Sequence, residues 1–276
     1  MIVTVVGGSR QGRAAAPRRR ARAIAGLLAS AALVSTVAAQ APDVIWGDGL
    51  PPRERPRGRK EPREFHFTRA AYNGFGFRSW TVDYPKADRQ FLIGLRRLTR
   101  LDASGDENPV RLDDPELNRF PFLYAVEVGY MSLTEDEVLG LRRYLLAGGF
   151  LVVDDFWGTA EWDNFESEMS RVLPGRPIRD LPLDHPLFRA FYRIDALVQV
   201  PNVGRGMAGG PTWERDGYEP ACRGILDDQD RLMVVINWNT DLGDAWEWAE
   251  NPYYPLKYST FAYQMGVNFI VYAMSH

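Results

Sequence analysis

The chain has 276 residues, of which 45% are hydrophobic and 25% are charged, and its formal net charge is −3. This length allows one large or two small domains, and the composition excludes a disordered chain, a collagen and a polytopic membrane protein. One cysteine excludes an internal disulfide framework, and three histidines leave little for a histidine-rich metal site.

Residues 1–39 have the pattern of a signal peptide. They contain six arginines, the last at Arg22, and no acidic residue, and an apolar run and small residues up to Ala39 follow. A basic, then apolar, then small-residue segment is typical of a secretory leader. We expect cleavage after Ala39 and export to the periplasm or the medium, with no membrane span in the mature chain. Without cleavage, the same run would serve as an N-terminal membrane anchor.

Residues 40–64 are interpreted as a linker, because prolines alternate there with charged residues and lack a backbone donor. Residues 65–276 are predicted to form a single domain. They carry 21 basic and 31 acidic side chains, a net charge of −10. An acidic surface repels phosphate backbones, so we expect no nucleic-acid partner.

The first half of this domain begins with a predicted strand at residues 66–69. A helix should follow Pro85, because its apolar residues recur at the helical period. A short strand is expected at 109–112 and a longer one at 120–128. The sequence thus already alternates strands with helices.

The next segment predicts a strand–helix–strand unit. Thr134 and Glu137 form a capping box at the start of a helix, and Gly148 with Gly149 ends it. The apolar run 150–153 suits a strand covered on both faces. This is a βαβ unit, which should be right-handed.

The last part predicts a helix from Glu161 to Leu173, a strand at 196–200, two strands around a polar turn at 224–226 and 231–237, and a final helix at 258–273. Alternating strands and helices predict an α/β fold. We expect a three-layer, flavodoxin-like sandwich with a largely parallel sheet.

Polar side chains follow three of the expected strands. They are Glu127 after the first, Asp154, Asp155 and Trp157 after the second, and Asn239, Asp241, Asp244 and Trp246 after the third. In parallel α/β sheets, ligands bind beyond the carboxyl ends of the strands. If these strands are parallel neighbours, their polar residues meet at one edge.

The adjacent carboxylates Asp154 and Asp155 are the most specific candidate pair of functional residues. Two nearby carboxylates raise one pKa, which suits acid–base chemistry or a hard divalent cation. The structural alternative is that one caps the next helix while the other forms a salt bridge. Asp241, Asp244 and Glu247, spaced by three, resemble a set of oxygen ligands but lack the EF-hand pattern, so a plain capped loop is the alternative.

Asp184 and His185 suggest a second chemistry. A carboxylate beside an imidazole can tune it as a base, so Asp155 and His185 are candidate catalytic residues that activate a water. The alternative is a turn that precedes a helix, because Pro186 follows His185.

Tryptophans are numerous and supply a binding alternative. Trp157 and Trp246 have faces that could stack on sugar rings, although most tryptophans are core residues. The candidate ligand-binding residues are Glu127, Asp154, Trp157, Asp184, Asn239, Asp241, Asp244 and Trp246.

Three blocks resemble a known bacterial family, the domain-of-unknown-function 4159 family. They are Leu-Leu-Ala-Gly-Gly-Phe-Leu-Val-Val-Asp-Asp at 145–155, Leu-Pro-Leu-Asp-His-Pro at 181–186 and Asn-Thr-Asp-Leu-Gly-Asp at 239–244. The resemblance implies a fold like that of class I glutamine amidotransferases but no activity, because none is assigned to the family. The amidotransferase cysteine has no counterpart, since Cys222 precedes an expected strand instead of ending one.

We therefore favour an exported domain that binds an envelope glycan or a protein partner without catalysis. The alternative is a hydrolase in which Asp154 or Asp155 acts with His185 to activate water, with or without a divalent cation.

Overall fold

The computed structural model describes residues 50–51, 64–76 and 78–276. The expected signal peptide and most of the expected linker lie outside these residues. The strands are β1 (Thr68–Ala71), β2 (Asn108–Arg111), β3 (Phe122–Val126), β4 (Phe150–Asp154), β5 (Ile178–Asp180), β6 (Ala221–Leu226) and β7 (Leu232–Trp238). The helices are α1 (Lys86–Leu98), α2 (Glu135–Leu146), α3 (Gly158–Val172), α4 (Val203–Ala208), α5 (Leu242–Glu247) and α6 (Leu256–Ser275).

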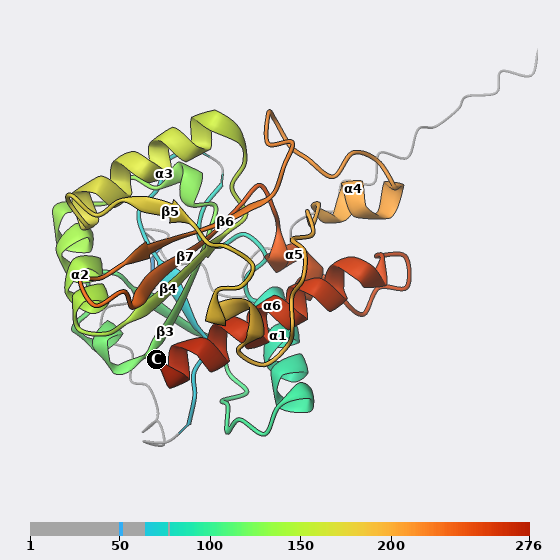
Figure 1. Ribbon diagram of the computed structural model, residues 1–276, viewed down its shortest axis with the longest axis horizontal. Helices are drawn as coiled ribbons and strands as arrows, with labels where there is room; N and C mark the ends of the chain where they lie inside the picture. The colour runs from blue at the N-terminus through green and yellow to red at the C-terminus, as the bar shows by residue number, and fades with distance from the viewer. Residues whose placement is uncertain (1–49, 52–63, 77) are drawn as a thin grey trace, which may run out of the picture. The chain divides into compact units, whose positions relative to one another are not determined.

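The strands form one seven-stranded sheet in the order β2-β1-β3-β4-β7-β6-β5 (Figure 1). Neighbours from β2 to β7 are parallel, whereas β6 is antiparallel to both β7 and β5. The predicted βαβ unit is present, with β3 and β4 in register from Phe122 opposite Phe150 to Val126 opposite Asp154. The predicted α/β fold with a largely parallel sheet is confirmed.

Helices cover both faces of the sheet (Figure 1). Successive strand residues point to opposite faces. Accordingly, Tyr124 and Val152 join the apolar cluster that includes α1, α5 and α6 residues, while Leu123 and Val153 join the cluster with α2 and α3. Strands buried on both faces explain why the apolar run at 150–153 is unbroken.

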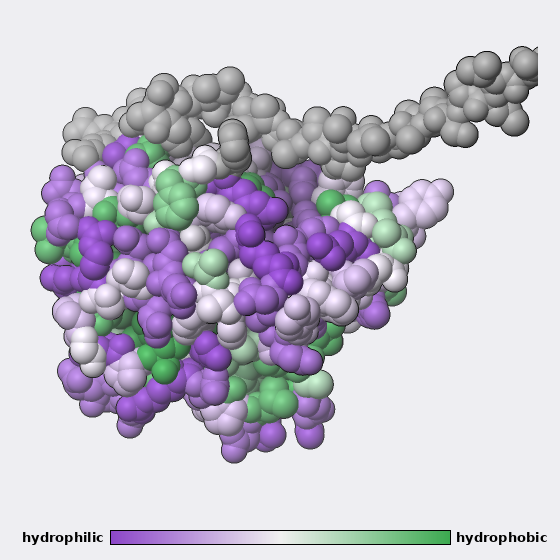
Figure 2. Space-filling view, turned by 90° about the horizontal axis from the view of Figure 1, so that it is seen from above, coloured by the Kyte–Doolittle hydropathy of each residue, from purple (hydrophilic) through white to green (hydrophobic). Residues whose placement is uncertain are grey.

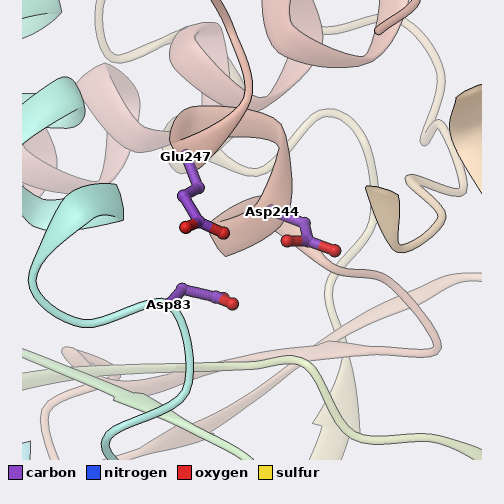
Figure 3. A group of neighbouring side chains, drawn as sticks. All are labelled: Asp83, Asp244 and Glu247. Atoms are coloured by element: carbon purple, nitrogen blue, oxygen red, sulfur yellow. The ribbon is translucent and has the colours of Figure 1, made fainter. Parts of the chain in front are cut away.

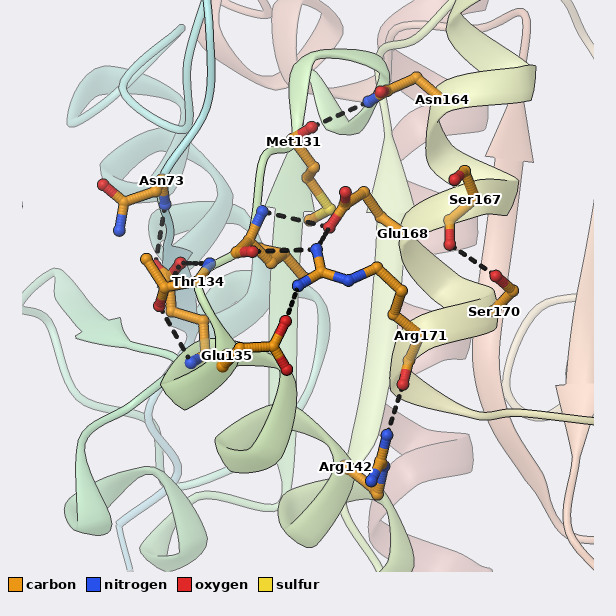
Figure 4. A network of polar contacts seen from close by, with 12 residues as sticks. Asn73, Met131, Thr134, Glu135, Arg142, Asn164, Ser167, Glu168, Ser170 and Arg171 are labelled. Carbon is orange, nitrogen blue, oxygen red and sulfur yellow. Dashed lines mark hydrogen bonds and ion pairs between the residues drawn. The ribbon is translucent and has the colours of Figure 1, made fainter.

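The loop between β3 and α2 is fixed by a polar network (Figure 4). The capping box at Thr134 is formed as predicted, and Asn73 N donates to Glu137 Oε1 at 2.8 Å. Glu168 accepts from Leu133 N at 3.1 Å, and Arg171 donates to Leu133 O at 2.9 Å. Through these bonds, Glu168 and Arg171 connect α3 to the residue that precedes the capping box of α2.

Two of the predicted strands need correction. Residues 196–200 form no strand, because Val200 N donates to Thr240 Oγ1 and Val200 O accepts from Asp241 N, so this segment runs along the loop after β7. Strand β3 ends at Val126, because Glu127 has the left-handed φ of 56° and a 3-10 turn, η2 (Val128–Tyr130), follows. Helix α5 was not predicted, since six residues are too few for a clear period.

The face in Figure 2 is mainly hydrophilic, and its hydrophobic residues form small separate patches. No helix among the described residues has both the length and the hydropathy that a membrane crossing needs.

Candidate carboxylate site at the sheet edge

The loops after β1, β3, β4 and β7 meet at one edge of the sheet, because these strands are adjacent and parallel. The loop after β1 contains Asp83, and the others contain Glu127, Asp155 and Asp241. The three polar clusters that follow the strands in sequence therefore lie together at the carboxyl edge.

The backbone at this edge adopts rarely populated conformations. Positive φ angles occur at six nonglycine residues of the described chain, and five of these lie in or above the edge: Asp83, Glu127, Asp155, Arg215 and Asn239. Left-handed backbone is unfavourable for such residues and persists only where the surroundings impose it, often at functional sites.

Asp154 is fully buried and anchors helix α5. Its Oδ2 accepts hydrogen bonds from Tyr124 Oη at 2.9 Å, Leu242 N at 2.8 Å and Gly243 N at 3.1 Å. Its Oδ1 has no hydrogen-bond partner among the described residues. Burial, and next the charge of Asp155, raise its pKa to about 8. Asp154 thus positions the first turn of α5.

Asp155 follows β4 directly and has a left-handed φ of 50°. Its Oδ1 accepts from Trp157 Nε1 at 3.0 Å, and its backbone links the loops after β3 and β7 through Glu127 N and Thr240 O. Its side chain is buried, and burial raises its pKa to about 6.

Helix α5 presents further acids to the same place. Asp241 caps the helix by accepting from Asp244 N at 2.7 Å, and Asp244 Oδ2 accepts from Val203 N at 2.6 Å. Burial raises the pKa of Asp241 far above its usual value, and the next influences are the neighbouring carboxylates. Burial also raises the pKa of Asp244 to about 7.

Asp83 lies at the centre of these acids. Its Oδ2 is buried and has no hydrogen-bond partner among the described residues. One oxygen each of Asp83, Asp155 and Asp241 lie within 4.8 Å of one another, and the same holds for Asp83, Asp244 and Glu247. Figure 3 shows the second group, with Glu247 pointing down toward Asp83. Burial, and next the charge of Asp244, raise the pKa of Asp83 well above its usual value.

The absence of a side chain at Gly243 allows these oxygens to lie close to the backbone of α5. A Cβ atom there would lie 2.5 Å from Asp83 Oδ2, 3.2 Å from Tyr124 Oη and 3.6 Å from Asp241 Oδ1. Any larger residue would clash with Asp83 Oδ2, so glycine permits the close approach of Asp83 to α5.

Glu127 lies beside the cluster and has a basic partner. Its Oε1 accepts from Arg78 Nη1 at 2.6 Å, and Arg78 also lies 3.8 Å from Glu214. Burial and the charge of Asp155 nevertheless raise the Glu127 pKa to about 10. Arg78 therefore offsets only part of the local negative charge.

The Asn239 side chain connects two backbone segments and is not free to bind a ligand. Its Oδ1 accepts from Gly158 N at 2.8 Å, and its Nδ2 donates to Glu219 O at 2.8 Å. Both ends of its amide are thus committed to joining the start of α3 to the segment before β6.

Trp157 and Trp246 are each only 1% exposed. Trp246 packs among Phe67, Phe91 and Tyr124, and Trp157 lies at the start of α3 with its indole on Asp155. Neither ring has a face open to a sugar, so glycan stacking on these two residues has no support in the structure.

His185 lies at the opposite end of β4 from Asp155. Its ring contacts Tyr272, 5.8 Å between centroids, and Tyr272 contacts Phe150, the first residue of β4. Five strand residues span roughly 15 Å, so the structure does not bring His185 to Asp155. Asp184 is exposed beside it, and His185 caps the 3-10 helix η3 (Pro186–Arg189).

Asp83 is the central residue that sequence reasoning missed. It follows β1 by twelve positions, in a loop with no regular pattern, so nothing local links it to the other acids. Only the adjacency of β1 and β3 in the sheet could have indicated it.

The comparisons with known proteins supply no activity. A search of curated proteins finds no match. The sequence profile described as "Domain of unknown function (DUF4159)" matches residues 66–274, nearly the whole described domain. The chain therefore belongs to the DUF4159 family.

Proposed function

We propose that this domain binds a divalent cation, Mg²⁺ or Ca²⁺, at the carboxyl edge through Asp83, Asp155 and Asp241, and that the cation serves to bind a ligand without catalysis. The observation that carries the proposal is the buried, unpartnered Oδ2 of Asp83, held beside two buried carboxylates.

The charges of these groups support a cation. Burying ionised carboxylates without a positive partner costs several kcal/mol each. After burial, the strongest influences on the pKa of Asp241 are four other carboxylates. The cluster must therefore take up protons or a cation, and oxygen-only donors are those that Mg²⁺ and Ca²⁺ prefer.

The distances between the carboxylate oxygens also fit a single bound cation. Three oxygens that each lie about 2.4 Å from one ion are separated by at most about 4.8 Å. The oxygens of Asp83, Asp155 and Asp241 meet this limit, since they lie within 4.8 Å of one another. Gly243 permits this close grouping, because a side chain there would meet the carboxylates of Asp83 and Asp241.

The position of His185 favours a binding function over hydrolysis. The hydrolase hypothesis pairs His185 with Asp155, and the two lie at opposite ends of β4. Export remains part of the proposal, supported by the basic, apolar and small-residue order of residues 1–39. An envelope glycan or protein is then the expected ligand.

A flavodoxin-like class is proposed as well. The order β2-β1-β3-β4, continued by the parallel β7, matches the 2-1-3-4-5 order of that class. Its ligands bind at the carboxyl edge, which is where the carboxylates gather.

Isothermal titration of the chelator-treated protein with Mg²⁺ and with Ca²⁺ tests the cation. We expect saturable binding that Asp241→Asn weakens at least tenfold, while Asp163→Asn on the exposed face of α3 leaves it unchanged. Asparagine keeps the capping oxygen for Asp244 N, so α5 should persist in the variant. Absence of binding by either cation, or equal affinity in Asp241→Asn, would overturn the proposal.

A further inference from the structure

We infer that the carboxyl edge holds two cations, with Asp83 as a bridging ligand between a first position at Asp155 and Asp241 and a second at Asp244 and Glu247. This inference rests on the proposed function and extends it to the number of ions and the chemistry of the ligand they take.

The shared residue is the geometric basis. Asp83 belongs to both groups of oxygens that lie within 4.8 Å of one another, and the other members of the two groups differ. A carboxylate has two oxygens and can bind one ion through each. Its Oδ2 is buried and lacks a hydrogen-bond partner, so it is available to an ion.

Helix α5 holds the second position in place. Asp244 and Glu247 are three residues apart and thus share one face of the helix (Figure 3). The helix start is fixed by Asp154, and Asp244 is held by Val203 N at 2.6 Å. The second position therefore needs no rearrangement of the backbone.

Charge favours two ions over one. The two positions together contain five carboxylates, and Lys86 lies 3.7 Å from Glu247 with its amine 3.6 Å from the Trp248 ring. With all five ionised, one divalent ion and Lys86 leave two negative charges. A second divalent ion neutralises them.

The pair implies a class of ligand. Two cations about 3.5–4 Å apart clamp an oxyanion between them. Glu247 is only partly buried, whereas Asp155, Asp241 and Asp244 are buried, so a ligand enters from the side of Glu247 in the second position. The ligand group is then a phosphate or carboxylate of an envelope molecule, and inorganic phosphate is a suitable probe.

The number of Mn²⁺ ions bound per chain tests whether the edge holds one cation or two. The chelator-treated protein is loaded with Mn²⁺, and bound metal is measured by elemental analysis and electron paramagnetic resonance. We expect two Mn²⁺ per chain with the broadened spectrum of a coupled pair. Glu247→Gln and Asp155→Asn should each bind one uncoupled ion, and Asp83→Asn should lose the coupling and at least one ion. Glu166→Gln on the exposed face of α3 should behave as the wild type.

The outcomes separate the two proposals. One ion in the wild type, lost in Asp155→Asn and kept in Glu247→Gln, overturns the pair and leaves the proposed cation site intact. No bound Mn²⁺ overturns both. Two ions without coupling, or unaffected by Asp83→Asn, overturn the bridging role of Asp83. Phosphate should bind to the Mn²⁺-loaded wild type at least tenfold more tightly than to loaded Glu247→Gln, and equal binding would overturn the assigned ligand class.

Discussion

Asp83 and Asp88 are five residues apart and are held in opposite ways. Asp88 is fully buried on α1 and accepts from Arg69 Nε at 2.9 and 3.1 Å, while Arg69 Nη1 donates to Trp80 O and Val82 O. Asp83 has a buried oxygen without a partner, among other acids. The comparison teaches that a buried acid matched by a cation within the fold is structural, whereas an unmatched one is available to a ligand.

The largest effect should come from breaking the matched pair. Asp88→Asn leaves Arg69 buried without a counter-charge, and we expect a loss of about 3–5 kcal/mol in the free energy of unfolding, measured by urea denaturation. Glu116→Gln, which removes an exposed pair with Arg119, should cost less than about 1 kcal/mol. Similar losses in the two variants would contradict the structural role of Asp88.

The unmatched cluster should make stability depend on pH. Burial raises the carboxyl pKa to about 8 for Asp154 and about 7 for Asp244, above their unfolded values near 4. The folded chain then binds more protons, so the free energy of unfolding of the metal-free protein should fall by several kcal/mol between pH 5 and 8.

Cations should restore this stability, since they displace the protons. The increase in Tm on adding Mg²⁺ or Ca²⁺ should therefore be larger at pH 8 than at pH 5. An increase that is equal at both pH values, or larger at pH 5, would argue against cation binding by these carboxylates.

Neutralising Asp83 should act in the opposite sense to neutralising Asp88. In the metal-free protein at pH 8, Asp83→Asn removes a buried carboxyl whose ionisation the neighbouring acids oppose, and we expect a gain of about 1 kcal/mol in the free energy of unfolding. The same variant should lose the stabilisation by cations. A loss of stability in the metal-free state would mean that Asp83 is a structural residue like Asp88.

Much of this architecture could be predicted from the sequence, because it is encoded locally. The capping box at Thr134, the apolar run at 150–153 and the stripe of the last helix each report a local period or cap. The position of Asp83 depends on which strands are neighbours, and the distance of His185 from Asp155 depends on how α6 crosses the sheet. Such nonlocal relations leave no pattern in one sequence.

Removing the hydrogen bond from Tyr124 to Asp154 should have a smaller effect on the free energy of unfolding. Tyr124→Phe removes the donor to Asp154 Oδ2, and we expect a loss of about 1 kcal/mol together with a further rise of the Asp154 pKa. Phe122→Leu on the same strand, which removes no hydrogen bond, serves as the control. Carboxyl titration by nuclear magnetic resonance, with Asp154 assigned, reads the pKa directly, and an unchanged value would contradict this contact.

The smallest effect is expected at His185. Its Nδ1 accepts from Leu187 N at 3.2 Å, so His185→Ala should cost about 0.5 kcal/mol or less and leave cation affinity unchanged. A tenfold change in cation affinity, measured by calorimetry, would show that His185 belongs to the carboxyl edge after all.

A crystal of the protein soaked in Mn²⁺ and measured at a wavelength near the manganese edge tests the cation site most directly. The account predicts anomalous difference density beside Asp83 Oδ2, within about 2.5 Å of oxygens from Asp155 and Asp241. Manganese density only elsewhere on the protein, with Asp83 still unpartnered, would contradict it.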